Sequence, residues 1–249
     1  LRCLVGSEMC IRDSQEAEDF ELDVEDLCRT LLNGYDFLIL CNPNNPTSSA
    51  ILKDEMRALL SFCANRDIFV MIDETYVEFA PSVQEVTAVP YTKDFSNLMV
   101  LRGVSKFYAA PGMRFGYGIT GNKEFLSQMK EKQIPWSLNS LGAYAGEQMF
   151  KDTSYIRQTR ALILTERDRM FLELKKMSSF KVYFPYGNFI LVKILKPEVT
   201  SFDVFEACIK EGLMIRDCSS FQCLDGEFIR FCIMKPEDNN RLLKVLKTI

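Results

Sequence analysis

LRGVSKFYAAPGMRFGYGI, residues 101–119, is the most informative stretch of this chain. An apolar run ends at its beginning, a loop that contains Lys106 follows, and a second apolar run with glycines comes after Arg114. We therefore predict two strands, Asn97 to Leu101 and Arg114 to Thr120, with Lys106 in the loop after the first. A lone loop lysine is usually solvated, so the neighbouring stretches must show whether this one has a role.

Two further motifs precede this stretch, and each follows an apolar run. CNPNNPT (41–47) comes at the end of a predicted strand, Phe37 to Cys41, and MIDETYVEF (71–79) begins in a second one, Ile68 to Ile72. The continuous apolar character of Ile68 to Ile72 indicates a strand buried on both faces, as parallel strands are. Helical spacing of apolar residues predicts a helix between them, Lys53 to Arg66. Alternating strands and helices indicate an α/β fold with a mostly parallel sheet.

The second half of the chain has a different order of elements. A long helix, Tyr155 to about Met177, is followed by the strands FKVYF and FILVKI, a helix, a strand at Phe228 to Ile233 and a last helix. We expect a partial large domain over residues 15–150, then a linking helix and a smaller α+β domain over residues 151–249. Residues 1–14, LRCLVGSEMCIRDS, resemble a translated sequencing-adapter read-through, and we expect them to be a non-native leader.

Composition excludes several classes of function. The net charge of -4 and the pI near 5.2 argue against a nucleic-acid or anionic membrane surface, which needs clustered Lys and Arg. The absence of histidine removes Ser/His/Asp triads and His-containing zinc sites. Nine cysteines without a CxxC pair favour reduced thiols and a cytoplasmic location. No apolar stretch approaches the roughly 20 residues of a membrane span, so we expect no membrane. We also expect no metal.

The motifs together match the chemical needs of pyridoxal 5'-phosphate. This cofactor has an aldehyde that reacts with an amine, a pyridine nitrogen that pairs with an acid, a phenolic oxygen that accepts hydrogen bonds and a phosphate that binds cations. Lys106 offers the amine and Asp73, at the end of a strand, the acid. Tyr76 and Asn45 offer donors to the phenolic oxygen, and Arg114 offers a planar fork to the phosphate.

Each of these residues also has an ordinary structural explanation. An Asp after a strand usually caps the next segment, and NPNNPT taken alone is a turn. The argument for a cofactor site rests on all of them occurring in one order along the chain.

In this order the motifs resemble the fold-type I, class I/II aminotransferase family, nearest its histidinol-phosphate aminotransferase and threonine-phosphate decarboxylase branch. The likeness runs from about Phe20 to the C-terminus and also includes IPWSLNS, YGNF, GLMIRDC and FIRF. It implies that Lys106 carries the cofactor and that Arg230 holds the substrate's carboxylate or phosphate. Arg216 and Asn188 are weaker substrate-side candidates.

Three departures from the family pattern stand out. Gly103 occupies a position where the family usually has a Ser or Thr that contacts the cofactor phosphate, and Ser48 follows NPT where glycine is usual. The segment that begins family members, with the first strand and a glycine-containing helix start, has no counterpart here. We therefore expect an N-terminally truncated chain.

The resemblance implies amino transfer on an amino acid or amino-phosphate substrate, by a homodimer. A decarboxylase of the threonine-phosphate type is the alternative, because the bond that breaks depends on whether the arginines hold a carboxylate or a phosphate. A third reading is an inactive fragment or a regulatory module that binds the cofactor without catalysis.

Overall fold

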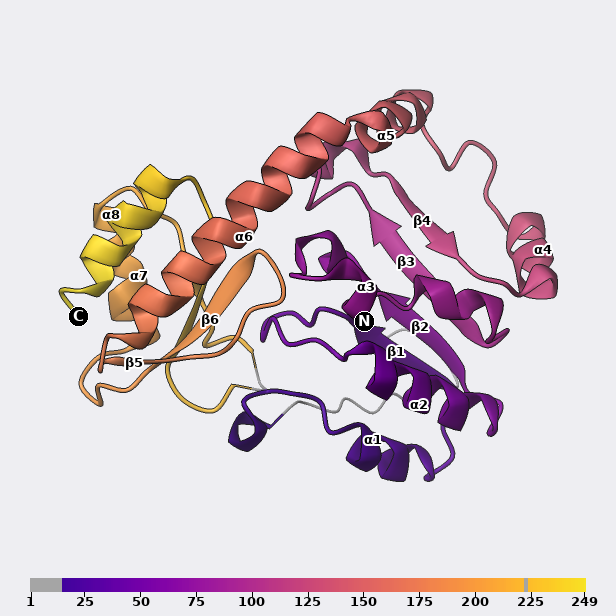
Figure 1. Ribbon diagram of the computed structural model, residues 1–249, viewed down its shortest axis with the longest axis horizontal. Helices are drawn as coiled ribbons and strands as arrows, with labels where there is room; N and C mark the ends of the chain where they lie inside the picture. Colours follow the sequence, from indigo (N-terminus) through magenta and orange to yellow (C-terminus); the bar gives the residue numbers. More distant parts are fainter. Residues whose placement is uncertain (1–14, 222–223) are drawn as a thin grey trace.

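A computed structural model describes residues 15–221 and 224–249 of the chain, so the predicted leader, residues 1–14, lies outside the described residues. Two four-stranded sheets form two separate parts, and the long helix α6 (Thr153–Lys175) runs from one part to the other (Figure 1). The first sheet is mostly parallel, which confirms the predicted α/β class.

Three parallel strands of the first sheet end at the same edge. Cys41 of β1 lies opposite Asp73 of β2, and Asp73 lies opposite Leu101 of β3. A fourth strand, β4, runs antiparallel to β3. The order is β1 (Phe37–Cys41), β2 (Phe69–Asp73), β3 (Leu98–Gly103) and β4 (Gly116–Ile119). The loops after β2 and β3 therefore start side by side.

Helix α2 (Lys53–Ala64) contributes the main apolar layer against this sheet. Its buried residues, Met56, Leu59, Leu60 and Cys63, are the ones that the helical spacing predicted. They pack with Val70 and Ile72 of β2 and Val100 of β3. Each fully buried aliphatic side chain contributes about 1.5–3 kcal/mol to the hydrophobic driving force.

The prediction that the second strand is buried on both faces is wrong. Val70 and Ile72 are buried under α2, whereas Phe69 and Met71 on the opposite face stay partly exposed. The contact on that face is with Phe125 of α4 (Lys123–Glu131), whose ring centroid lies 4.9 Å from that of Phe69. A continuous apolar run therefore does not by itself show which face a helix covers.

Arg114 does not begin the next strand, as the sequence pattern predicted. It ends a short 3-10 helix, η4 (Pro111–Met113), in the left-handed conformation with φ 49°, and β4 begins two residues later at Gly116. Several other elements were not predicted. Among them are helix α4, none of whose residues is buried, and strand β7 (Arg216–Asp217), which is only two residues long.

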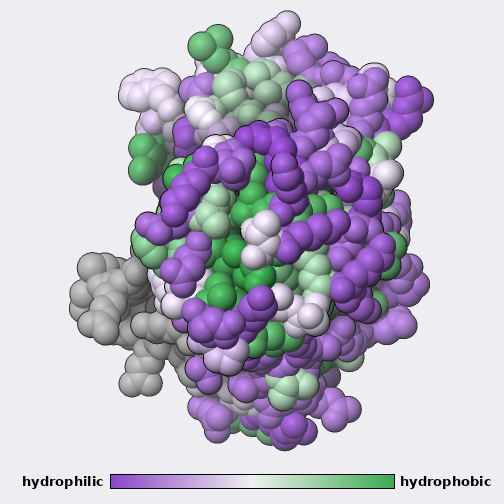
Figure 2. All heavy atoms as spheres, turned by 90° about the vertical axis from the view of Figure 1, so that its left-hand side faces the viewer, coloured by the Kyte–Doolittle hydropathy of each residue, from purple (hydrophilic) through white to green (hydrophobic). Residues whose placement is uncertain are grey.

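The second sheet is antiparallel and packs against helices. Its order is β5 (Phe180–Val182), β6 (Phe189–Ile194), β8 (Phe228–Cys232) and β7. Its core joins α6 to α7 (Ser201–Lys210) and α8 (Pro236–Leu246) through residues such as Met170, Val204 and Leu242. Figure 2 shows this end of the molecule, with apolar side chains gathered at its centre and hydrophilic side chains around them.

Two arginines of α6 join the two parts. Arg167, only 1% exposed, donates to the carbonyl oxygens of Phe79 (2.9 Å), Tyr186 (3.3 Å) and Gly187 (3.4 Å). Arg160 donates to the carbonyl oxygen of Ala80 at 3.1 Å. Side chains of one helix thus donate to backbone carbonyl oxygens of both parts.

The remaining elements of the described residues are α1 (Val24–Leu31), α3 (Val83–Val86), α5 (Ser140–Lys151), η1 (Glu16–Glu18), η2 (Val77–Phe79) and η3 (Val89–Lys93).

The first described residues are anchored to the second sheet. The ring of Phe20 is buried, with its centroid 4.9 Å from that of Tyr183. Glu16 accepts hydrogen bonds from Tyr183 (2.8 Å) and Lys193 (2.7 Å). Burial alone would raise the pKa of Glu16, but these hydrogen bonds and the charge of Lys193 hold it below its ordinary value of 4.5.

Within residues 15–221 and 224–249, no helix has the length and apolar character needed to cross a membrane.

We expect Glu16→Gln to lower the melting temperature at pH 7 by about 1–3 °C, the effect of a partly exposed ion pair. A carboxyl with a lowered pKa in the folded state stabilises the protein above its ordinary pKa of 4.5 and loses that contribution as pH falls through the folded value. Thermal unfolding followed by circular dichroism should therefore show that the difference in melting temperature between the wild type and the variant becomes smaller at acidic pH. Glu18→Gln, on the exposed side of the same turn, is the control. A difference in melting temperature that does not change with pH would contradict this account.

Candidate active site

Asp73 lies where the parallel strands end, at the wall of a cavity of about 270 Å³. Thr75, Gly103, Ser105 and Arg114 line the same cavity. Oδ1 of Asp73 accepts hydrogen bonds from the backbone N–H of Thr75 (2.9 Å) and from its hydroxyl group. Among the described residues Oδ2 has no hydrogen-bond donor. One oxygen is therefore fixed by the turn while the other is available to a ligand.

Arg114 supplies the positive charge of this cavity. Its Nη1 donates to the carbonyl oxygen of Pro111 at 3.1 Å, and no carboxylate of the described residues pairs with it. The other arginine of the cavity, Arg102, is already paired with Glu74 at 2.7 Å. Arg114 is consequently the cation that an incoming anion meets here.

Gly103 is a tight position for the hydroxyl side chain that the family usually has there. It pairs with Gly116 of β4, and a Cβ built on Gly103 would lie 3.3 Å from the carbonyl oxygen of Phe115. That atom belongs to the backbone of the adjacent strand and does not move easily. The glycine thus follows from the close approach of β3 and β4.

Lys106 lies beside Tyr76. Its Nζ is 5.7 Å from the centroid of the Tyr76 ring, and no carboxylate of the described residues forms an ion pair with it. Tyr76 in turn packs edge-on against Phe189, with the ring centroids 5.1 Å apart. The lysine amine therefore has an aromatic neighbour and no acidic one, which leaves it available for a reaction.

Asn45 and Arg230 contact each other although they are far apart in the sequence. Oδ1 of Asn45 accepts a hydrogen bond from Nη1 of Arg230. The guanidinium carbon of Arg230 lies 5.1 Å from the centroid of the Phe189 ring. Phe189 thus packs against both Tyr76 and Arg230. Sequence reasoning placed it in an apolar strand and missed this role, for which the pattern carries no signal.

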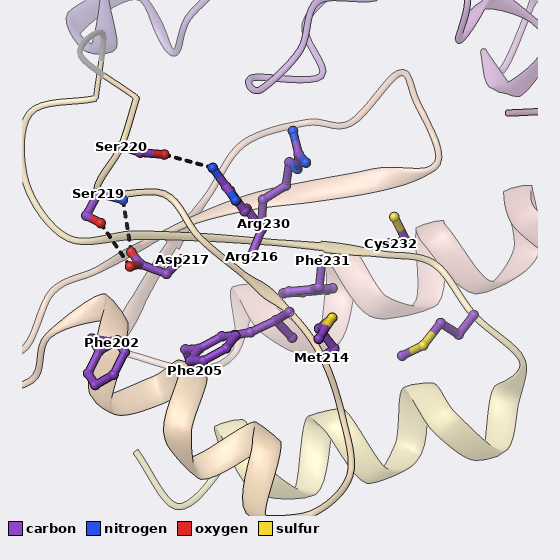
Figure 3. Close-up of a pocket in the computed structure, with 12 residues that line it drawn as sticks. Phe202, Phe205, Met214, Arg216, Asp217, Ser219, Ser220, Arg230, Phe231 and Cys232 are labelled. Atoms are coloured by element: carbon purple, nitrogen blue, oxygen red, sulfur yellow. Dashed lines mark hydrogen bonds between the residues drawn. The ribbon is translucent and has the colours of Figure 1, made fainter. Parts of the chain in front are cut away.

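Arg216 lies directly opposite Arg230 in the pairing of β7 with β8. Both line a cavity of about 650 Å³ that also contains Ser219 and Ser220 (Figure 3). Arg216 donates to the hydroxyl of Ser220 at 2.8 Å, and no carboxylate of the described residues pairs with either arginine. Two unpaired cations on adjacent strands make this cavity suited to an anion.

Asp217 forms no ion pair with either arginine, although the charge of Arg216 acts on it. Burial alone would raise its pKa, but hydrogen bonds from Ser219 and Ser201 and the charge of Arg216 hold the pKa below its ordinary value. Figure 3 shows its carboxylate turned toward Ser219, away from the guanidinium groups.

Asn188 is outside both cavities. Its side-chain oxygen is buried without a hydrogen-bond donor among the described residues.

Comparison with known proteins identifies the family. Residues 5–246 match the sequence profile of the class I and II aminotransferases. The chain belongs to this family. It is 32% identical over 231 residues to the histidinol-phosphate aminotransferase of Methanothermobacter thermautotrophicus, covering 93% of this chain and 60% of that protein. It is 29% identical over 235 residues to the threonine-phosphate decarboxylase of Salmonella typhimurium, covering 94% of this chain and 63% of that protein.

A solved structure supports the same assignment. The histidinol-phosphate aminotransferase of Clostridium acetobutylicum superposes with a TM-score of 0.86 and 34% identity, covering 93% of this chain and 68% of that one. The chain spans less than two thirds of the length of the curated relatives named above. The resemblance inferred from the motifs is confirmed at the level of the family.

The cofactor of class I and II aminotransferases is pyridoxal phosphate, and the residues of this chain fit it. The unpaired Oδ2 of Asp73, the unpaired amine of Lys106 and the uncommitted guanidinium of Arg114 correspond to three of its groups. The roles of the individual residues stay predictions.

One further group at this edge of the sheet was not predicted. Glu74, which follows Asp73, is fully buried and accepts hydrogen bonds from Nε (3.0 Å) and Nη2 (2.7 Å) of Arg102. Thr87 and the backbone N–H of Ala88 also donate to this carboxylate. The only sequence signal was the second acidic residue of DETY, which alone predicts nothing about burial.

We expect Arg114→Ala to raise the dissociation constant of pyridoxal phosphate about 10- to 100-fold, because a charge-assisted hydrogen bond to the phosphate is lost. Fluorescence or absorbance titration with the cofactor measures this change. Arg157→Ala, which removes an exposed arginine of α6, is the matched control and should leave the affinity unchanged. Equal affinities of the Arg114 variant and the wild type would remove Arg114 from the phosphate site.

Proposed function

We propose that the chain is a pyridoxal-phosphate-dependent aminotransferase that acts on an amino acid or amino-phosphate substrate, similar to histidinol-phosphate aminotransferases. One observation carries the proposal. Residues from distant stretches meet in two sets of contacts that the short segments 73–76 and 105–106 connect. Asp73 and Arg114 share a cavity, which Thr75 and Ser105 also line. Tyr76 contacts Phe189 and Lys106, and Phe189 also contacts Arg230.

In this proposal each cofactor-binding residue has one task toward the cofactor. Asp73 pairs with the pyridine nitrogen, Arg114 holds the phosphate, and Tyr76 and Asn45 donate to the phenolic oxygen. When bound, pyridoxal phosphate supplies a ring that stabilises negative charge at the substrate's α-carbon. Lys106 holds the cofactor and then, as a free amine, accepts the α-proton of the substrate at Nζ.

Arg230 and Arg216 are the proposed substrate-binding residues. The cavity of about 650 Å³ that they line is large enough for a small amino compound. Two guanidinium groups without carboxylate partners favour a substrate with an anionic group in addition to its amine, and the hydroxyls of Ser219 and Ser220 add donors. This preference supports an amino-phosphate substrate. Asn188, with its buried unpaired oxygen, is the remaining candidate for a substrate contact.

The same arginine pair is the observation that favours decarboxylation as the second candidate. If the arginines bind a phosphate, the substrate's carboxylate is left without a cation and is free to leave as CO2. Incubation with histidinol phosphate and with threonine phosphate, with 2-oxoglutarate present, separates the two reactions. Formation of glutamate indicates amino transfer, and release of CO2 without glutamate indicates decarboxylation.

We expect borohydride reduction of the protein with bound cofactor to place the pyridoxyl group on Lys106, as peptide mapping by mass spectrometry would show. Lys106→Ala should reduce turnover at least about 1,000-fold, since both the covalent attachment and the proton acceptor are lost. Lys123→Ala, at the start of α4, is the control. A label on another lysine, or a wild-type protein without transaminase or decarboxylase activity, would contradict the proposed function.

We also propose a homodimer, and a cytoplasmic location on the basis of the cysteine pattern. The segment between α4 and α5 and the first turn of α5 expose large apolar side chains, among them Ile134 (76% exposed), Trp136 (97%) and Leu141 (78%). Neighbouring exposed apolar residues of this kind are typical of a surface that binds another protein. A second copy of the chain is the partner that the family resemblance favours.

We expect the double variant Trp136→Ser, Leu141→Ser to sediment as a monomer at concentrations at which the wild type is a dimer, because the apolar contact area is removed. Analytical ultracentrifugation measures the association. Leu172→Ser, an exposed apolar residue of α6 on the other part of the molecule, is the control. If the double variant and the wild type associate equally, the interface lies elsewhere.

A further inference from the structure

Ser48 occupies a backbone conformation that favours glycine. Its φ is 64°, in the left-handed region, and it is fully buried. A residue with a Cβ adopts this region only at a cost that the surrounding structure must offset. Glycine would fit here without that cost. The contacts of the Ser48 side chain therefore need an explanation.

The hydroxyl of Ser48 connects the two parts of the molecule. Its Oγ accepts a hydrogen bond from the backbone N–H of Gly187 at 2.8 Å, and its carbonyl oxygen accepts one from the N–H of Tyr186 at 2.8 Å. Ser48 belongs to the loop after β1 that also carries Asn45, whereas Tyr186 and Gly187 form the turn before β6. A glycine at position 48 would keep the carbonyl contact and lose the hydroxyl contact.

Other groups fix the same turn from its remaining sides. Arg167 donates to the carbonyl oxygens of Tyr186 and Gly187, and the carbonyl oxygen of Asn188 accepts from the N–H of Ile233 at 2.8 Å. A Cβ on Gly187 would lie 3.1 Å from both the Ser48 Oγ and the Phe189 ring. Little space therefore remains for the turn to shift while the Ser48 hydroxyl is in place.

The turn leads directly into the residues of the candidate site. Asn188 follows Gly187, and Phe189 comes next, with its ring packed against Tyr76 and Arg230. A shift of the turn would move Phe189 and, through it, the guanidinium of Arg230. Small displacements of a group that orients substrate cost activity even when that group keeps its chemistry.

We propose that Ser48 is a positioning residue for substrate binding: its hydroxyl fixes the turn of residues 186–188 and thereby places Phe189 and Arg230 for the substrate. The inference rests on the proposed function, in which Arg230 binds substrate. In this role Ser48 touches neither substrate nor cofactor. Removal of its hydroxyl should therefore weaken substrate binding more than it slows the chemical step.

The test is Ser48→Gly, which removes the hydroxyl and also relieves the backbone conformation. The melting temperature should stay within about 2 °C of the wild type, since the two effects on stability oppose each other. We expect KM for the amino substrate to rise about fivefold or more, with kcat within about twofold. Hydrogen exchange of the Gly187 amide, measured without cofactor or substrate, should become about fivefold faster. Ser48→Ala is the second variant and should show the same faster exchange.

Ser49→Ala is the matched control. Ser49 lies next to Ser48, and its hydroxyl bonds to Thr47 within the loop, not to the 186–188 turn. Its substitution should leave both KM and Gly187 exchange unchanged. Equal KM values for Ser48→Gly and the wild type would overturn the inference, as would unchanged exchange at Gly187. A wild-type protein without activity would overturn the proposed function, and the exchange measurement would still decide whether the hydroxyl fixes the turn.

Discussion

The buried ion pair between Glu74 and Arg102 is the interaction on which the arrangement of the candidate site depends. Glu74 directly follows Asp73, and Arg102 precedes Lys106 by four residues, so the pair joins the ends of β2 and β3 where the two proposed functional segments begin. The backbone N–H of Glu74 also bonds to the carbonyl oxygen of Leu101 at 2.9 Å. Loss of Arg102 would leave the fully buried Glu74 carboxylate without its cation, at a cost of about 3–5 kcal/mol. The acid and the lysine are therefore held in a fixed relation by a residue pair that does not itself need to contact the cofactor.

Helix α6 has a comparable role between the two sheets. Its apolar residues belong to the core of the second sheet, whereas Arg160 and Arg167 donate to carbonyl oxygens of the segment after Tyr76. Glu166, one residue before Arg167, accepts from Asn239 of α8 at 2.7 Å and from Arg169 at 2.6 Å. One helix thus fixes the position of the second sheet relative to the loop that carries Tyr76. The contact between Asn45 and Arg230 depends on this arrangement.

The sequence predicted those parts of the structure that follow from local periodicity and from motif order. The strands Phe37–Cys41 and Phe189–Ile194 have the predicted bounds, and the apolar face of α2 is the predicted one. Helix α4 and strand β7 were missed, although Asn122, which caps α4 by accepting from the N–H of Phe125, was a usable signal. The site residues were predicted as a group only because their order resembles a family, and their individual roles stay predictions. Glu74, Phe189 and Ser48 gain their roles from partners 28 to 139 positions away, which no local pattern reveals.

The pairing of Arg216 with Arg230 has a consequence for how the protein responds to its solution. Like charges that face each other across a strand ladder repel, so this part of the sheet is less stable without a counter-ion than with one. A small multivalent anion that binds there relieves the repulsion and stabilises the folded state, by an amount that grows with the logarithm of its concentration above the dissociation constant. If this surface binds the substrate, as proposed, phosphate and sulfate buffers compete with the substrate for it. The apparent substrate affinity is then a property of the medium as well as of the protein.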